Sequence, residues 1–296
     1  MPVAAYRPIR ADGVGAIVGR REVRITTRMT MAYAAGIGAI DAMYLDDLRP
    51  GGVVAPLPYI TALEWPVLTS TDYLTAIGRD APSAFDGLLH AFQDTRFARP
   101  VRPGMRVLVV GQIVEIIATA AGALVVCRIR TSDQSDDALV AESWYGSLYR
   151  HTAVDGRPAA LFARPVLRSA PSLLDEEANK SFVINIPREK AHVYTECAQI
   201  WNPIHTERSY AISAGLPDII LHGTCTWAMT LQGLASRTKS GPPELPFRRF
   251  GARFSRMVVP GSAISVEYST CEEGYVSFVV RNASGDIALS YGTAEA

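Results

Sequence analysis

Two stretches of the 296-residue chain repeat each other, RFARPVRPG at residues 96–104 and RFSRMVVPG at residues 253–261. Six of the nine positions are identical at a constant offset of 157 residues. Each copy ends in Pro-Gly, a turn-forming pair, because proline presets φ and glycine admits a positive φ. The repeat therefore predicts a chain built from two structurally equivalent halves.

Three β-rich runs follow each copy of the repeat. Their apolar and polar residues alternate with period two between clusters of Gly, Asn, Asp and Ser, which is typical of antiparallel strands. The most apolar stretch, residues 107–127, has the length of a membrane span. Gln112 and Glu115 interrupt it, and ATAAGA at its centre supplies a turn, so we expect two strands joined by a hairpin.

Helix candidates precede the strands of each half. The ranges are 29–45 in the first half and 188–200, 207–215 and 223–237 in the second, with a strand before each set at 22–27 and 181–187. Helices followed by runs of strands indicate an α+β fold. We expect the helices at 29–45 and 223–237 each to be cradled by a sheet. The two sheets should join edge to edge, since a long unpaired edge invites aggregation.

The composition narrows the class of protein. There are 29 Lys and Arg against 29 Asp and Glu, a net charge of zero, which argues against nucleic-acid or membrane-surface partners. The four cysteines are widely spaced and form no CxxC pair, so we expect no metal site and a reducing cytoplasm. The N-terminus has no apolar signal segment, and nucleotide-binding glycine motifs are absent, so no cofactor is expected.

The segment from Tyr194 to Gly223 carries the candidate chemistry. Asn202-Pro203 should end the 188–200 helix and place His205 on an exposed loop, as a candidate acid or base. Gly223 begins an apolar helix, where the free backbone N–H groups of Gly223 and Thr224 would form an oxyanion hole. The alternatives without a catalytic role are a structural or solvated loop histidine and an ordinary helix start.

This segment resembles the hydratase motif of the MaoC-like dehydratases, or hydratase 2 enzymes. That motif runs from an aromatic residue through S-G-D-x-N-P-hydrophobic-H-x-D and then A and G to hydrophobic-x-H-G. The matching residues are Tyr194, Asn202, Pro203, Ile204, His205, Glu207 (for Asp), Ala211, Gly215, Ile220, His222 and Gly223. The resemblance implies a double hotdog, in which each half wraps a curled antiparallel sheet around a long helix.

The resemblance also implies an activity and a division of the chain. The substrate would be an acyl thioester of CoA or acyl carrier protein, hydrated or dehydrated with His205 as acid/base, Gly223 as oxyanion donor and Asn202 orienting the loop or water. The N-terminal repeat would span residues 1–150 and be degenerate. A linker would span 151–177, and residues 178–296 would form the repeat that carries the motif. A homodimer, or pairing with a related hotdog subunit, is expected.

One departure from the motif leaves the chemistry open, because Ile200 stands where the family has its catalytic Asp. Glu196, one turn earlier on the predicted helix, is one candidate substitute. A second interpretation is that His205 acts alone on an activated substrate. A third is that the protein binds thioesters without hydrating them, as a partner of an active relative. An enzyme that isomerises or cyclises an unsaturated chain is a further alternative.

The remaining assignments concern the substrate pocket. The small residues of the first helix, Ala34, Ala35, Gly36 and Gly38, and the following Gly51-Gly52, fit either a widened pocket wall or close helix packing. We assign substrate-binding roles to Tyr33, Tyr59, Tyr194 and Trp201, with Tyr44 and Pro56 as further lining candidates, and we add His222 as a further site residue.

Overall fold

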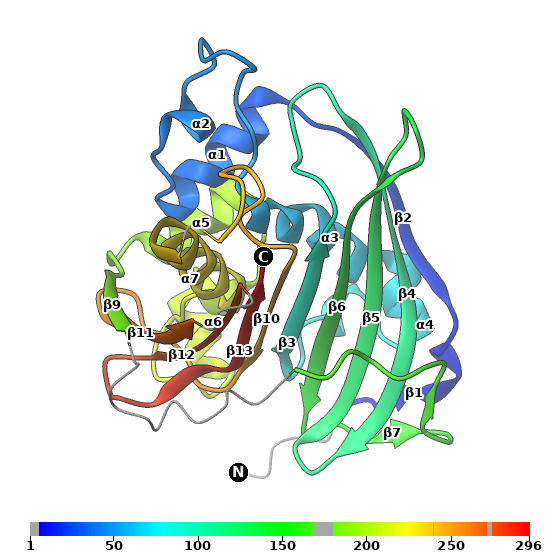
Figure 1. Cartoon of the computed structure of the whole chain (residues 1–296). Coiled ribbons are helices and arrows are strands. Elements are labelled where there is room, and N and C mark those ends of the chain that lie inside the picture. Colours follow the sequence, from blue (N-terminus) through cyan, green and yellow to red (C-terminus); the bar gives the residue numbers. More distant parts are fainter. Residues whose placement is uncertain (1–5, 168–179, 239, 271–273) are drawn as a thin grey trace.

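A computed structural model describes residues 6–167, 180–238, 240–270 and 274–296. Across these residues, eleven strands form one antiparallel sheet in the order β2-β4-β5-β6-β3-β10-β13-β12-β11-β9, with β8 pairing β4 off this path. Helices lie against the sheet, and the colours of Figure 1 show the strands of the first half on one side and those of the second half on the other. This is the α+β double hotdog that the sequence predicts.

The first half holds five of these strands and most of the short helices. Its strands are β2 (Ile17–Arg24), β3 (Leu88–Phe97), β4 (Arg106–Thr119), β5 (Gly122–Asp133) and β6 (Leu139–Arg150). Its α-helices are α1 (Thr27–Ile37), α2 (Ala42–Leu45), α3 (Ile60–Leu68) and α4 (Thr71–Ala76). The 3₁₀ helices are η1 (Ala11–Gly13), η2 (Leu57–Tyr59) and η3 (Ala81–Ser83).

The second half repeats the strand pattern. Its strands are β9 (Lys180–Asn185), β10 (Arg249–Phe254), β11 (Ala263–Thr270), β12 (Tyr275–Arg281) and β13 (Ile287–Glu295). Its helices are α5 (Lys190–Ala198), η4 (Pro203–His205), α6 (Arg208–Ser213) and α7 (Gly223–Thr238). The predicted hairpin across residues 107–127 is confirmed as β4 and β5.

The segment between the halves adds two short strands to the first half. In it, β7 (Val154–Asp155) pairs in parallel with β1 (Ile9–Arg10), and β8 (Ala159–Ala160) pairs with β4. Part of the predicted linker at 151–177 lies outside the described residues. The ranges 1–150, 151–177 and 178–296 assigned from the sequence remain predictions.

The halves join through β3 and β10, two strands that the sequence analysis did not predict. They pair antiparallel, and Asp94 lies opposite Gly251. Residues 94 and 251 are themselves related by the offset of 157, so a pseudo-twofold axis passes through this pair. The predicted edge-to-edge junction is confirmed, and it turns each half's open edge into an interior ladder.

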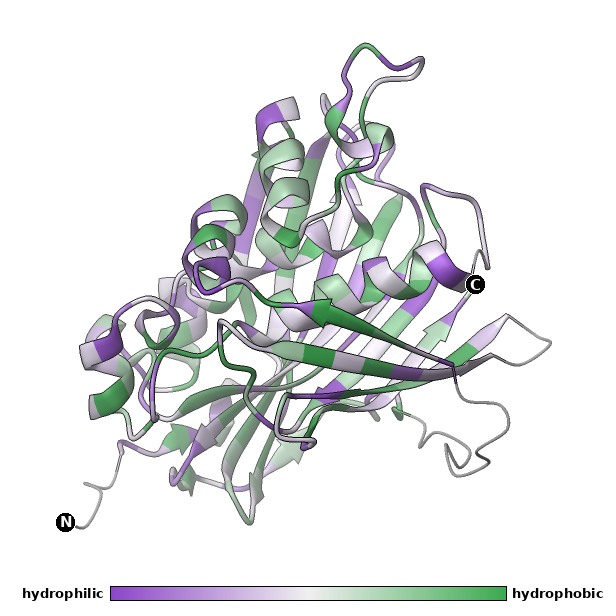
Figure 2. Cartoon of the chain, turned by 90° about the vertical axis from the view of Figure 1, so that its left-hand side faces the viewer, coloured by the Kyte–Doolittle hydropathy of each residue, from purple (hydrophilic) through white to green (hydrophobic). Residues whose placement is uncertain are grey.

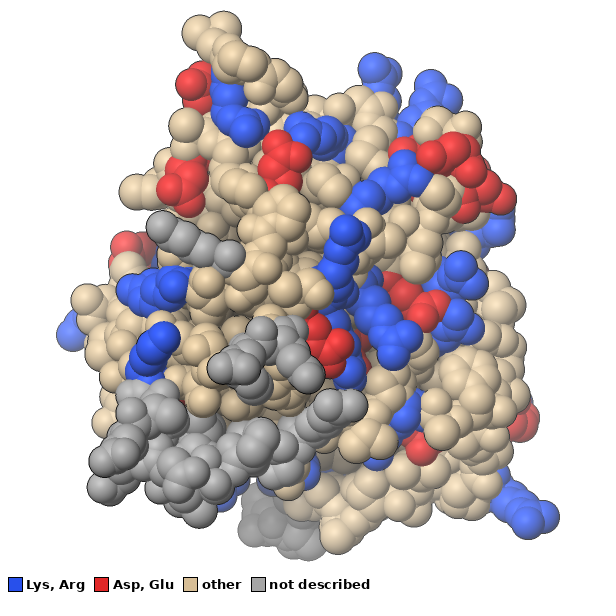
Figure 3. Space-filling view, in the orientation of Figure 1, with Lys and Arg blue, Asp and Glu red and all other residues tan. Residues whose placement is uncertain are grey.

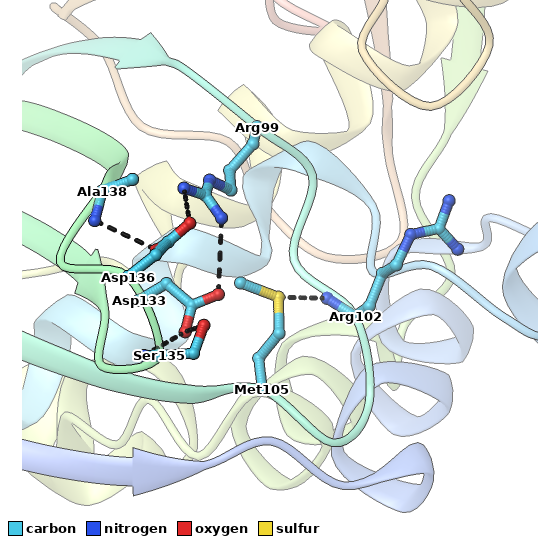
Figure 4. A network of polar contacts seen from close by, with 7 residues as sticks. All are labelled: Arg99, Arg102, Met105, Asp133, Ser135, Asp136 and Ala138. Atoms are coloured by element: carbon cyan, nitrogen blue, oxygen red, sulfur yellow. Dashed lines mark hydrogen bonds and ion pairs between the residues drawn. The ribbon is translucent and has the colours of Figure 1, made fainter.

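The repeated sequence marks the same place in both halves, the exit from the joining strand. β3 ends at Phe97 and β10 ends at Phe254, again 157 residues later. In the first copy Arg99 forms ion pairs with Asp133 (3.5 Å) and Asp136 (2.8 Å) at the β5–β6 turn, as Figure 4 shows. The Met105 sulfur nearby accepts a hydrogen bond from the Arg102 backbone (Figure 4). The first copy therefore links a strand end to a neighbouring hairpin.

The predicted helix at 29–45 is wrong in its bounds and in its partner. α1 ends at Ile37, because Gly38 takes a left-handed φ of 76° as its C-cap. α1 packs mainly against α5, and the helix that contacts β2 and β4 in the first half is α3. The equivalent of α7 is therefore α3, a helix that the sequence analysis missed because its pattern, ITALEWPVL, contains a proline.

Apolar side chains line the strands, and charges of both signs cover the surface. β11 shows the alternation plainly, since Ile264, Val266 and Tyr268 are buried and the residues between them are not. Figure 2 shows apolar residues concentrated on the sheet, and Figure 3 shows Lys and Arg interspersed with Asp and Glu on one face. Within the described ranges, no helix is both long and apolar enough to cross a membrane.

Candidate active site

The end of α5 shapes the loop that carries His205. Gln199 adopts a left-handed φ of 55°, which ends the helix at Ala198 and turns the chain away from its axis. Ile200 therefore lies outside the helix, and the predicted helical face shared by Glu196 and Ile200 does not form. The Glu196 side chain is exposed, whereas Ile200 is 4% exposed and packs in the core.

Asn202 organises the next turn. Its Oδ1 atom accepts a hydrogen bond from the backbone N–H of Ile204 at 3.3 Å, capping η4. Pro203 occupies the first position of η4, where its fixed φ suits a helix start. The pair therefore sets the path of the chain into His205, consistent with the loop-orienting role expected for Asn202.

His205 is buried, so the expectation of an exposed loop histidine is wrong. Its side chain keeps 9% of its surface exposed, and its Nδ1 atom lies 2.8 Å from the carbonyl oxygen of Ile220. The ring stacks on His222 with a centroid separation of 3.7 Å and an interplanar angle of 26°. The loop that precedes α7 thus folds back over η4 and covers the imidazole.

His222 is fixed from its opposite side. Its Nε2 atom lies 3.1 Å from the backbone oxygen of Ile200 and 3.1 Å from the hydroxyl of Thr195. The Ile200 position therefore contributes to the site through its carbonyl group, while its side chain fills the core. The edge of the Tyr194 ring contacts His222 at a centroid distance of 5.0 Å.

These contacts assign the tautomer of each histidine. A carbonyl oxygen only accepts hydrogen bonds, so the proton of neutral His205 sits on Nδ1 and that of His222 sits on Nε2. The lone pair of His205 is then on Nε2, which has no hydrogen-bond partner among the described residues. Neutral His205 therefore has its Nε2 atom available to accept a proton.

Burial keeps both rings neutral. Removal from water disfavours the imidazolium form and lowers the pKa of His205 to about 4, against a small opposing effect of the Ile220 carbonyl. Burial lowers the pKa of His222 as well, and the neighbouring His205 lowers it further. Both rings are therefore unprotonated at neutral pH.

The N-terminus of α7 offers free backbone donors. Among the described residues, no acceptor pairs with the backbone N–H of Gly223 or Thr224, whereas those of Cys225 and Thr226 bond to the His222 carbonyl. A Cβ at position 223 would lie 2.8 Å from the Phe254 ring, so only glycine fits there without a shift. The free donors and the helix dipole together favour a developing oxyanion.

Three of the four predicted substrate-binding residues form a buried cluster. Tyr33 donates to the Pro58 carbonyl at 2.7 Å and lies 3.4 Å from the Tyr194 hydroxyl, and Tyr59 packs edge-on against Tyr33. All three rings are buried, and Tyr194 touches His222. These tyrosines pack behind His222 through the Tyr194 ring. Their direct contact with a substrate stays a prediction.

Trp201, the fourth, lies on the surface beside the His205 loop. It is 48% exposed, donates to Glu207 at 3.4 Å and packs edge-on against Phe85 of the first half, at a centroid distance of 5.7 Å. Trp201 therefore connects the second half of the chain to the first half.

Of the small residues in and after α1, Gly36 serves close helix packing. A Cβ on Gly36 would lie 2.7 Å from the Cβ of Cys197 on α5, while added atoms at Gly51 and Gly52 would meet nothing within 4 Å. Two hollows on the described surface, one lined by Lys180, Arg237 and Tyr268 and the other by residues 10–14 and 155–161, do not include His205. A cavity shared by His205 and Gly223 remains a prediction.

Two ionisable residues near the seam, the buried Glu64 and the half-buried His90, were not predicted as site residues from the sequence. Glu64 of α3 is 1% exposed and accepts a hydrogen bond from Gln93 at 3.0 Å, and burial raises its pKa to about 8. His90 of β3 is sandwiched between Tyr145 and Phe254. Both stand on elements absent from the sequence prediction, so no pattern pointed to them.

Comparisons with known proteins show what each half of the chain is similar to. A model of the MaoC-like domain matches residues 171–283, and a model of the FAS1-like dehydratase domain region matches residues 13–142. 3-Hydroxyacyl-thioester dehydratase Y of Mycobacterium tuberculosis is 27% identical over 283 residues, covering 94% of this chain and 93% of that protein. Residues 171–283 therefore match a MaoC-like domain, and the chain as a whole is similar to MaoC-like dehydratases.

Solved structures show the same fold in this MaoC-like chain. A MaoC-like dehydratase from Phytophthora capsici superposes with a TM-score of 0.82 at 19% identity, covering 96% of each chain. A Mycobacterium tuberculosis protein described as having a double hotdog fold superposes with a TM-score of 0.58 at 13% identity. That alignment covers 95% of this chain and 94% of the other. Both likenesses concern the fold.

Proposed function

We propose that this MaoC-like protein is a hydratase or dehydratase of acyl thioesters, carried by CoA or acyl carrier protein, with His205 as its acid/base. The observation that carries the proposal is the tautomer of His205, whose Nδ1–H is held by the Ile220 carbonyl and whose Nε2 is free. The names of the relatives, dehydratases of hydroxyacyl thioesters among them, agree with this chemistry.

In the hydration direction, His205 Nε2 removes a proton from water while the water oxygen bonds to the β-carbon of a trans-2-enoyl thioester. The electron pair of the double bond moves onto the thioester oxygen, where the N–H of Gly223 or Thr224 donates to it. The imidazolium then returns its proton to the α-carbon, and the enolate collapses to the 3-hydroxyacyl thioester. Dehydration is the reverse sequence.

Ile200 changes how water is held. An isoleucine side chain accepts no hydrogen bond, and the exposure of Glu196 disfavours that carboxylate as a substitute at the buried His205. His205 is then the sole side-chain base in the proposal, which suits a substrate with an acidic α-proton or a good leaving group. An enzyme that isomerises or cyclises an unsaturated acyl chain would use the same base and oxyanion donor.

A second candidate function is an acyl-thioester-binding subunit without hydration chemistry. The observation that favours it is Ile200, which is buried in the core where the family carries a carboxylate. Such a subunit would pair with a copy of itself or with an active hotdog relative.

Two variants separate these functions. His205→Ala should lower kcat for trans-2-enoyl-CoA hydration by about 10²-fold or more, because the proton acceptor is lost. Ile200→Asp should raise hydration above the wild-type rate if the scaffold lacks only this group, and Ile200→Asn is its uncharged, matched control. Hydration is followed by the loss of enoyl absorbance, and thioester binding by calorimetry.

The outcomes point in different directions. A wild-type protein that binds a thioester analogue but shows no turnover, with neither variant changing this, favours the binding subunit. If Ile200→Asp destroys a native activity that His205→Ala spares, both role assignments are wrong, and Ile200 is a working part of a dry pocket.

A further inference from the structure

His90 occupies an unusual place at the seam between the two halves. Its ring stacks on Tyr145 of β6 at a centroid distance of 3.8 Å and on Phe254 of β10 at 4.0 Å, which bridges the two halves. Phe254 in turn lies so close to Gly223 that a Cβ added to this glycine would contact the Phe254 ring. A continuous row therefore runs from the oxyanion donor through Phe254 to His90.

A β-bulge aims His90 at this place. His90 pairs with Ser147, and Phe92 pairs with the adjacent Gly146, so Ala91 is the extra residue on β3. Without it, residues 90 and 92 would face the same side of the sheet. Phe92 instead packs in the apolar cluster with Trp144, and His90 turns to the opposite face. Bulges of this kind re-aim a side chain next to functional sites.

The ring carries a buried nitrogen without a partner. Nε2 of His90 is buried, and no described residue bonds to it. Burial lowers the pKa of His90 to about 3, against an opposing effect of the Phe92 backbone, so the imidazole is neutral. Its stacked faces are already filled, and only the Nε2 edge is left to make a hydrogen bond. An orphaned buried acceptor is costly, which favours a ligand that satisfies it.

We propose that His90 is a specificity-determining residue of the acyl site, and that Nε2 accepts a hydrogen bond from a hydroxyl on the acyl chain beyond the β-carbon. The inference rests on the proposed function, because it places the thioester oxygen at Gly223 and the chain along Phe254. The preferred substrate class is then a hydroxylated acyl thioester rather than a plain hydrocarbon chain. A site built to bond a hydroxyl discriminates strongly against the analogue that lacks it.

The test compares two trans-2-enoyl-CoA substrates of equal chain length, one with a distal hydroxyl and one without. Wild-type protein should show a kcat/KM at least about tenfold higher for the hydroxylated substrate. His90→Phe keeps an aromatic ring between Tyr145 and Phe254 and removes the nitrogen, so it should bring the ratio of kcat/KM for the two substrates close to one. His90→Gln, which keeps an acceptor, should retain part of the preference.

Binding measured by calorimetry with the matching saturated acyl-CoA pair gives a readout independent of turnover. A wild-type protein that processes both substrates without preference overturns the inference and leaves the proposed function standing, whether or not any variant folds. An equal loss for both substrates in His90→Phe also overturns it, because the ring then serves packing alone. Failure of the wild-type protein to bind or convert either thioester removes the proposed function, and the inference with it.

Discussion

At the scale of single residues, the stacked histidines determine the protonation state of the site. His205 and His222 each donate a hydrogen bond from one ring nitrogen to a backbone carbonyl. Neither ring contacts a carboxylate in the described structure. Without a negative partner, burial dominates and disfavours the imidazolium form of both rings. His205 is therefore a weak base that stays unprotonated over a wide pH range.

The pH dependence of activity follows from this. Because the pKa of His205 falls from its ordinary 6.5 to about 4, the base form persists through mildly acidic solution. The acid limb of kcat/KM should therefore lie near pH 4 to 5. The pH–rate profile of thioester hydration measures it, and an acid limb near 6.5 would contradict the buried, neutral imidazole.

The same shift makes stability depend on pH. Between pH 6.5 and about 4 the unfolded His205 binds a proton that the folded one does not, so the unfolding free energy falls as pH falls through this window. His205→Asn should flatten that slope in urea unfolding series, since asparagine keeps polarity without titrating.

Glu64 gives the opposite sign. Burial raises its pKa from 4.5 to about 8, so in that window the folded protein holds a proton that the unfolded chain has lost. The unfolding free energy should therefore fall as pH rises from 4.5 to 8. Glu64→Gln keeps the bond from Gln93 and should stabilise the protein at pH 8 by a few kcal/mol. The exposed Glu196→Gln is the matched control, and equal unfolding midpoints for the two variants would refute this account.

At the scale of elements, α1 and α5 pack more closely than side chains normally allow. Gly36 faces Cys197, and the Lys190 ammonium group donates to the Gly36 carbonyl at 3.2 Å, which satisfies the end of α1. This contact holds the first half against the helix that precedes the His205 loop. The glycine is thus a packing device between equivalent elements of the two halves.

Gly36→Ala should destabilise the protein by about 1–3 kcal/mol, because the added methyl group clashes with Cys197. This cost exceeds the gain in helix propensity that alanine brings. Thermal unfolding measures the loss. Combining the change with Cys197→Gly removes the clash and should recover part of the stability. If the double variant is no more stable than the sum of the single changes predicts, the contact is not the cause.

At the scale of the whole molecule, the seam between the halves depends on a buried ion pair. Arg249 donates to both carboxylate oxygens of Asp94, at 2.8 and 2.7 Å, and also pairs with Glu295 at 2.9 Å. Asp94 sits on the pseudo-twofold axis with 2% of its side chain exposed. One strand pairing, β3 with β10, and this contact therefore join the two sheets.

Arg249→Met should cost about 3–5 kcal/mol, because it leaves a buried carboxylate without its partner. Urea unfolding measures the cost. Asp94→Leu combined with Arg249→Met removes both charges and should be markedly more stable than Arg249→Met alone. If the double variant is as unstable as Arg249→Met alone, the unpaired Asp94 carboxylate is not the cause of the loss. The geometry of the ion pair would then be what stabilises the seam.

The sequence by itself determined the double structure of this protein. The offset of 157 residues between the repeats recurs at the ends of β3 and β10 and at the starts of β4 and β11, Arg106 and Ala263. Strand alternation and Pro-Gly turns depend on residues that are close along the chain, so the sequence alone predicts them. The same holds for the Asn202-Pro203 turn and the start of α7 at Gly223.

Only the tertiary structure decided which elements meet. Sequence analysis paired the wrong helix with the first sheet and placed His205 in solvent, because burial and partner choice come from residues distant in the chain. The stacking of His205 on His222 depends on the loop before α7 folding back onto η4, and the aim of His90 depends on a bulge defined by the partner strand. The physical reason is that the tautomers, pKa values and close contacts of these groups arise from packing, which composition and spacing do not encode locally.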